Sequence, residues 1–245
     1  MSFGAIADDY DRLRPRAPTE AVDWLLPDDC RSAVDVGAGT GLLSRALADR
    51  VAQVTAVEPD PRMRAVLRAR SPGVRVLAGT GEAIPLPDAS VDGVFASSAW
   101  HWMEPDRAVP EIARVLRDGG RFGVIWTSRD RESGWLHDLD LAPAASAVDP
   151  AAGSRRGHHE VELPEGAAFT EIETRSFAFG RAMTLDDFVD MYATTSRLIT
   201  ASPRDRATEL ARLRAVLRER FPDSAQIDVP MRSRCWRADR VRRYP

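Results

Sequence analysis

Apolar and polar positions alternate in two different ways along the first half of this chain. Short apolar runs of the kind that form buried strands predict strands at 33–36, 53–57, 74–78, 91–96 and 122–126. Between them, apolar residues at helical spacing predict helices at 20–26, 42–50, 61–70 and about 106–116. Strands that alternate with helices at these lengths predict βαβ units and a mostly parallel sheet.

Polar residues, proline and glycine indicate where several of these helices begin and end. Thr19 is expected to cap the first helix, and Asp60, with Pro61 at the first helical position, is expected to cap the third. Gly119 and Gly120 are expected to end the fourth helix.

After Trp126 the pattern becomes less regular. Thr184 opens a capping box with Asp in place of Glu, which predicts a helix that runs towards Thr194. The remaining expected elements are a helix at 132–141, a strand at 169–179, a long amphipathic helix at 203–220 and a last strand at 227–236.

Right-handed crossovers place the C-terminal ends of parallel strands at one edge of the sheet. The residues that follow the expected strands therefore come together, and they lie at 37–41, 58, 80–82 and 97–102. This edge is where we expect the chemistry of the protein.

Composition narrows the class of protein. A chain of 245 residues with a formal net charge of -3 has no overall field that favours nucleic acid or an acidic membrane. No apolar run approaches the roughly 18 residues of a membrane helix, and the N-terminus lacks the pattern of a secretory signal. Cys30 and Cys235 are too few for a disulfide scaffold or a thiolate metal site. We expect a cytoplasmic, metal-free protein with a single domain over 1–245.

The most informative run extends from Val34 to Arg50 and reads as a buried strand, a glycine turn and the start of a helix. Its glycines form G-x-G-x-G, and Leu42 stands where a dinucleotide fold needs its third glycine. The chain contains no lysine, which also excludes a Walker phosphate loop. Glu58 closes the next apolar run, and a carboxylate there suits the two hydroxyls of a ribose.

This turn, Glu58 and two further stretches resemble the class I S-adenosylmethionine-dependent methyltransferases. The stretches are GTGEAIPLPDASVDGVFASSAWHWM, residues 79–103, and RVLRDGGRFGVIW, residues 114–126. Within that class the chain is most similar to the small-molecule enzymes related to the ubiquinone/menaquinone and trans-aconitate methyltransferases. The ordered motifs cover about residues 10–126, and the resemblance is weak beyond them.

The resemblance implies an α/β fold with a Rossmann-like doubly wound sheet, mostly parallel, with an antiparallel C-terminal strand and helices on both faces. Residues 1–30 are expected to form an N-terminal lid and helix, 31–128 the cofactor-binding core, and 129–245 the last strands and an acceptor-side cap. It further implies transfer of a methyl group from S-adenosylmethionine to O, N or C of a small metabolite, with S-adenosylhomocysteine as product and a monomer or homodimer as the working form.

The resemblance also assigns the donor site. The turn that contains Gly37, Ala38, Gly39 and Gly41 is expected to hold the methionine end, and Asp35 to orient the turn or the ammonium group. Glu58 is expected to accept the ribose hydroxyls, while Asp60 either contacts adenine or only caps its helix. Many relatives carry Asp at the position of Thr80, so Thr80, Gly81 and Glu82 are expected to share the adenine contact.

The acceptor side is expected around the segment that follows the fourth strand. Ser97 and Trp102 are candidate contacts near the methyl group, where an indole face can meet a sulfonium; Trp100 is either a second such contact or a core residue. His101 is the candidate general base. Tyr10 in the lid is expected to face the methyl group, and Arg14 or Arg16 to meet a carboxylate of donor or acceptor. His158 and His159 lie in a loop that either enters the acceptor site or stays on the surface.

Two other functions remain open from the residues alone. One is an NAD(P)-dependent oxidoreductase on a related sheet, which Leu42 and the absence of a Tyr-x-x-x-Lys pair disfavour. The other is a repurposed S-adenosylmethionine-binding protein that has lost methylation. The signature [DN]-P-P-[YF] of amino-methylating nucleic-acid enzymes is absent, so a small-molecule acceptor is expected.

Overall fold

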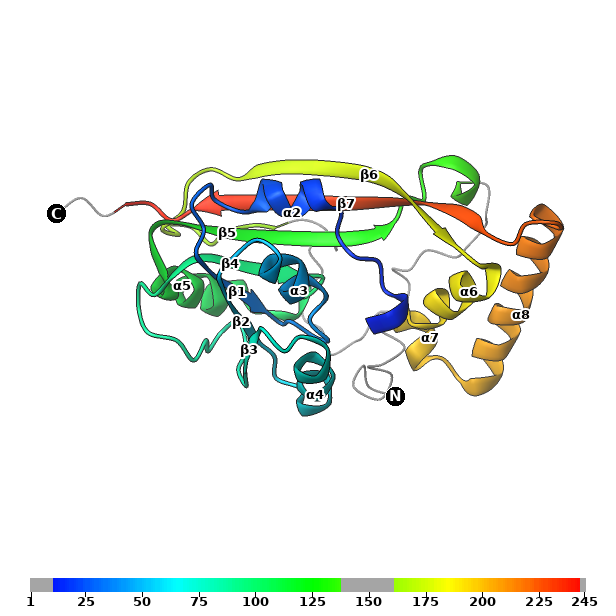
Figure 1. Cartoon of the computed structure of the whole chain (residues 1–245), viewed down its shortest axis with the longest axis horizontal. Helices are drawn as coiled ribbons and strands as arrows, with labels where there is room; N and C mark the ends of the chain where they lie inside the picture. Colours follow the sequence, from blue (N-terminus) through cyan, green and yellow to red (C-terminus); the bar gives the residue numbers. More distant parts are fainter. Residues whose placement is uncertain (1–10, 138–160, 243–245) are drawn as a thin grey trace. The chain divides into compact units, whose positions relative to one another are not determined.

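The computed structural model describes residues 11–137 and 161–242, which divide into two compact units (Figure 1). Unit 1 contains the described residues of 1–15, 128–156 and 178–232, and unit 2 contains those of 16–127, 157–177 and 233–245. The candidate donor-site residues that the structure describes all belong to unit 2.

Seven strands form one sheet in the order β3-β2-β1-β4-β5-β7-β6. Their bounds are β1 Ser32–Val36, β2 Gln53–Val57, β3 Arg75–Leu77, β4 Val91–Ser97, β5 Leu116–Arg129, β6 Glu173–Met183 and β7 Ile227–Asp239. From β3 to β5 each strand is parallel to its neighbour, with Val34 of β1 opposite Thr55 of β2 and Val94 of β4.

The last strand runs antiparallel to β5, as expected. Gly119 N donates to Arg240 O and Asp130 N donates to Pro230 O, so residue numbers fall along β7 as they rise along β5. The fold class predicted from the sequence is confirmed.

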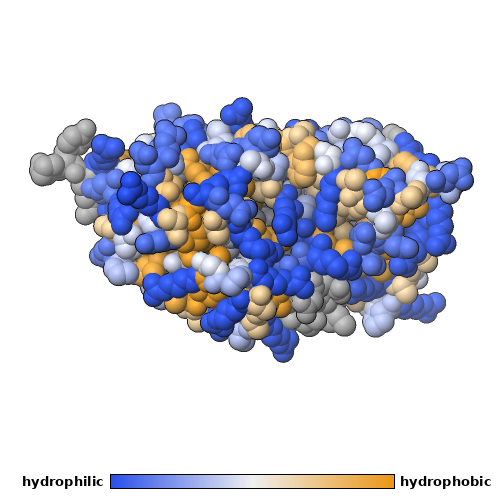
Figure 2. Space-filling model, viewed as in Figure 1, coloured by the Kyte–Doolittle hydropathy of each residue, from blue (hydrophilic) through white to orange (hydrophobic). Residues whose placement is uncertain are grey.

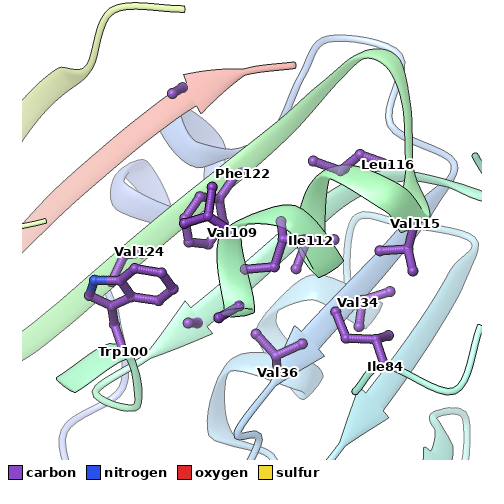
Figure 3. Close-up of a cluster of buried hydrophobic side chains, with 14 of the residues drawn as sticks. Val34, Val36, Ile84, Trp100, Val109, Ile112, Val115, Leu116, Phe122 and Val124 are labelled. Carbon is purple, nitrogen blue, oxygen red and sulfur yellow. The ribbon is translucent and has the colours of Figure 1, made fainter. Parts of the chain in front are cut away.

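Helices cover both faces of the sheet in unit 2. Residues of α2 (Thr19–Leu25), α3 (Leu42–Ala48) and α4 (Pro61–Arg70) share one buried cluster with Ala33 of β1. The next residue, Val34, faces the other side and packs with α5 (Pro105–Val115) in the cluster of Figure 3. This alternation along a strand buried on both faces is what positions the turns at its C-terminal end.

Unit 1 has a hydrophobic core of its own. It is built from α6 (Leu185–Ala193), α7 (Ser196–Thr200), α8 (Pro203–Arg220) and parts of β6 and β7. Phe188 of α6 is fully buried, and its ring centroid lies 5.4 Å from that of Trp135 in η3 (Gly134–Leu136).

Several expected boundaries are wrong. Thr19 is the first residue of α2 and not its cap, because Pro18 holds that position. Gly119 and Gly120 do not end α5; they lie within β5, where the register with β4 shifts between Val91 and Gly93. Such a bulge needs extra residues on one strand, and glycine suits it. The helix expected at 132–141 is a turn and the short η3 as far as residue 137.

Hydrophilic and hydrophobic residues are interleaved over the face drawn in Figure 2. Within 11–137 and 161–242 no helix has the length and apolar character needed to cross a membrane. The same described residues contain no group of three or more His, Cys, Asp or Glu side chains placed to hold a metal ion.

Candidate functional site

The turn between β1 and α3 is held by left-handed glycines. Gly37, Gly39 and Gly41 have φ values of 66°, 56° and 88°, a region that L side chains rarely adopt. A Cβ at Gly37 would lie 2.6 Å from Ala99 Cβ, so the turn approaches the segment after β4 closely. A Cβ at Gly39 would have no atom within 4 Å, which leaves that side of the turn open to a ligand.

The backbone amides of this turn already have partners within the protein. Gly37 N and Ala38 N donate to Val57 O at 2.8 and 3.2 Å, and Gly41 N donates to Ala38 O at 2.9 Å. These hydrogen bonds fix the turn to the end of β2 without a ligand. The open side at Gly39 offers a ligand a surface without side chains.

Glu58 connects the loop after β1 with the loop after β2. Its Oε2 accepts from Gly39 N and its Oε1 from Asp60 N, both at 2.8 Å, and the residue is only 7% exposed. Burial raises the pKa of Glu58, while the amides of Asp60 and Gly39 act in the opposite direction. Each carboxylate oxygen keeps one further lone pair, so the group can still accept two hydroxyl donors.

Asp60 has the capping role predicted for it. Its Oδ1 accepts from Arg62 N at 2.7 Å at the start of α4. This bond uses only one oxygen, and the adenine contact stays a prediction.

Asp35 lies behind the turn and is completely buried. Its Oδ2 accepts from Ser44 Oγ at 2.6 Å, which ties β1 to α3. Its Oδ1 has no hydrogen-bond partner among the described residues, and the same holds for the buried hydroxyl of Thr40 in the turn. Desolvation raises the pKa of Asp35 to about 7. The hydrogen bond from Ser44 acts against this rise, and the negative charge of Glu58 adds to it. The carboxyl group thus acts on the turn through Ser44.

The loop after β3 brings Thr80, Gly81 and Glu82 to the same edge. Thr80 forms an isolated antiparallel bridge with Ala83. Glu82 Oε1 accepts from Glu104 N at 2.9 Å, so this carboxylate holds the residue that precedes α5. The adenine role of these residues stays a prediction.

Met103 is the residue that sequence reasoning missed. Its Cε would lie 3.4 Å from a Cβ at Gly37, and its Sδ would overlap a Cβ at Gly81. Two positions without a side chain therefore make room for this one. Met103 brings the loops after β1, β3 and β4 into contact, and its only signal in the sequence was its place at the end of the matching stretch 79–103.

The two tryptophans in the segment after β4 differ in burial. Trp100, in η2 (Trp100–Trp102), is 4% exposed and lies 5.2 Å from the Phe122 ring, so it is a core residue (Figure 3). Trp102 is 59% exposed, and its ring centroid lies 5.1 Å from that of the exposed His101. Ser97 is the last residue of β4, and Ser98 after it has a positive φ of 51°. This backbone conformation costs energy in a serine and turns the chain at the candidate site.

Four expected residues do not belong to the described part of unit 2. Tyr10, His158 and His159 lie outside the described residues. Arg14 belongs to unit 1, where its Nη2 donates to Thr194 O at 2.9 Å. A pocket in unit 1, lined by Arg12, Arg181 and Asp187 among others, contains none of the predicted site residues.

The fold is of the class I methyltransferase type, and four loops converge at one edge of its sheet. A model of the methyltransferase domain family matches residues 34–124, which include the glycine turn, Glu58 and the loops after β3 and β4. An uncharacterized methyltransferase of Mycobacterium tuberculosis (strain ATCC 25618 / H37Rv) is 42% identical over 217 residues, 89% of this chain and 86% of the relative.

Two further proteins are similar to this chain. An uncharacterized methyltransferase-like protein of Schizosaccharomyces pombe is 33% identical over 76% of this chain and 74% of its own. A solved structure from Anaeromyxobacter dehalogenans, assigned as a type II methyltransferase, matches with a TM-score of 0.70 and 26% identity, over 94% of this chain and 99% of that chain. The chain belongs to the methyltransferase family and is an S-adenosylmethionine-dependent methyltransferase.

Proposed function

We propose that the protein transfers a methyl group to O, N or C of a small metabolite, with the donor held at the edge formed by the loops after β1 to β4. The observation that carries this proposal is the carboxylate of Glu58, which is fixed by two backbone amides at 2.8 Å beside the open face of Gly39. A fixed acceptor beside a surface without side chains suits a ribose and the chain attached to it.

The other residues have complementary roles in this proposal. The turn of Gly37, Ala38, Gly39 and Gly41, supported from behind by Asp35, receives the methionine end. Thr80, Gly81 and Glu82 border the adenine, with Asp60 beside them.

S-adenosylmethionine, when bound, supplies an electrophilic methyl group on a sulfonium. The task of the protein is then to orient the acceptor in line and to keep water away. The exposed Trp102 offers an indole face in the segment that follows Ser97, and His101 accepts the proton when the acceptor is an O–H or N–H group. Tyr10, which lies outside the described residues, is proposed to face the methyl group.

We also propose that, among class I methyltransferases, this chain is most similar to the small-molecule enzymes related to the ubiquinone/menaquinone and trans-aconitate methyltransferases. It rests on the ordered motifs over about residues 10–126. The alternative of an NAD(P)-dependent oxidoreductase is disfavoured because Leu42, where a third glycine is needed, starts α3.

Incubation of the protein with methyl-labelled S-adenosylmethionine and metabolite extracts tests the proposal directly. We expect a labelled small molecule that forms with the wild-type protein and fails to form with Glu58→Gln. Glu171→Gln, which alters an exposed carboxylate away from these loops, is the matched control and keeps the activity. Tight binding of S-adenosylhomocysteine without any labelled product would instead support a repurposed binding protein, and thermal stabilisation by NAD alone would support an oxidoreductase.

A further inference from the structure

Arg129, the last residue of β5, is a half-buried cation in unit 1. Its guanidinium carbon lies 4.7 Å from the centroid of the Tyr192 ring and 5.7 Å from that of Phe188. Its Nη1 is enclosed and has no hydrogen-bond partner among the described residues. The guanidinium therefore rests on aromatic rings and lacks a protein acceptor at this nitrogen.

The neighbouring charged groups do not neutralise this cation. Asp130 is adjacent in sequence, but its Oδ2 accepts from Arg232 Nε at 3.0 Å and Nη2 at 2.6 Å. Glu209 accepts from the Tyr192 hydroxyl at 3.3 Å. The pKa of Arg129 is lowered to about 10 by burial and by the positive charges of Arg131 and Arg14, and raised in part by Tyr192. Arg129 remains charged at neutral pH.

An enclosed guanidinium nitrogen without an acceptor is unfavourable, because the hydration lost at that nitrogen is not repaid by a partner. An apolar side chain of similar length would fit the same aromatic surroundings at lower cost. The arrangement becomes favourable when an anion from outside the chain completes it.

The surroundings indicate which anion fits. The planar guanidinium fork matches a carboxylate with two parallel hydrogen bonds. Phe188 and Tyr192 belong to a buried apolar cluster that includes Leu198 and Met191. A hydrocarbon body attached to a singly charged carboxylate suits such a cluster, whereas a doubly charged phosphate would lose more hydration there.

We propose that Arg129 is the anchor of a binding site for an organic carboxylate in unit 1. The guanidinium binds the carboxylate of the ligand.

The test compares sodium benzoate, the neutral benzamide and inorganic phosphate as ligands of the full chain at constant ionic strength, by calorimetry and thermal unfolding. We expect benzoate to bind and to raise the melting temperature more than benzamide or phosphate does. Arg129→Met is expected to weaken benzoate binding by about tenfold or more, a loss of about 1.4 kcal/mol. Without ligand, this variant should melt at a higher temperature than the wild type.

Arg175→Gln is the matched control, because Arg175 also lies over a phenylalanine ring, 5.2 Å from the centroid of Phe177, on exposed β6. It should leave benzoate binding unchanged. Arg129→Gln serves as a second variant if Arg129→Met does not fold. Absence of benzoate binding to the wild type, or equal binding to the Arg129 variants, overturns the proposal. Equal binding of phosphate that is lost in the variants overturns the choice of carboxylate.

Discussion

The buried carboxyl group of Asp35 makes a quantitative prediction about stability and pH. Its pKa is raised from 3.8 to about 7, first by desolvation. A carboxyl group whose pKa is higher in the folded state contributes stability below its ordinary pKa and loses that contribution as pH rises through the folded value. Between about pH 5 and pH 7 the folded protein holds a proton that the unfolded chain has released. The wild type therefore loses about 1.4 kcal/mol of unfolding free energy per pH unit from this group.

Asp35→Asn removes this dependence, because an amide does not titrate and its oxygen can still accept from Ser44. The unfolding free energy of the variant minus that of the wild type should rise by about 3 kcal/mol from about pH 5 to about pH 8. Urea unfolding at a series of pH values measures this change, and taking the difference cancels the titrating groups that do not interact with Asp35.

Asp92→Asn is the control with the opposite sign. Asp92 is partly desolvated, but bonds from Ser32, Arg31 and Arg117 outweigh this effect and lower its pKa. Its stabilising contribution is present above its ordinary pKa and is lost only as pH falls through the folded value. The variant should be destabilised by the same amount throughout pH 5 to 8. A flat or falling difference for Asp35→Asn would refute the assigned burial of a protonated Asp35.

Two further predictions distinguish residues that pack in the core from residues that face a ligand. Gly37→Ala should lower the unfolding free energy by about 2 kcal/mol or more, because the new Cβ would lie 2.6 Å from Ala99 Cβ and φ is 66°. Gly39→Ala, whose Cβ meets no atom within 4 Å, should lower it by only about 1 kcal/mol through backbone strain, and thermal unfolding measures both effects. Trp100→Ala should lower the unfolding free energy by about 3 to 5 kcal/mol, because Trp100 is 4% exposed. Trp102→Ala should change it by less than about 1 kcal/mol and should reduce methyl transfer. Equal losses of stability in the two variants would contradict the assignment of Trp100 to the core and Trp102 to the site.

Local signals predicted the helices best. Pro61–Arg70 and Pro203–Arg220 have the expected bounds, because each begins with proline after a capping side chain, Asp60 or Ser202. The order of strands and helices in the core followed from apolar periodicity. The extent of β5 could not be predicted, since its pairing with β7 joins residues more than 100 positions apart, as in the bond from Gly119 N to Arg240 O.

The same distinction applies to the candidate site. Gly37 and Glu58 were recognisable because their chemistry is local to a turn and a strand end. Met103 and Arg129 were not, because their significance depends on neighbours from other elements: Gly37 and Gly81 for the first, Tyr192 and Phe188 for the second. Both are ordinary residues in the sequence and become informative only through packing.

The central claim is that Glu58 holds the ribose of the methyl donor, and calorimetric titration with S-adenosylhomocysteine tests it most directly. Glu58→Gln should weaken binding by about tenfold or more, because one oxygen is replaced by an amide donor that faces a backbone N–H. Glu171→Gln should bind like the wild type. Unchanged affinity in a folded Glu58→Gln protein would contradict the account.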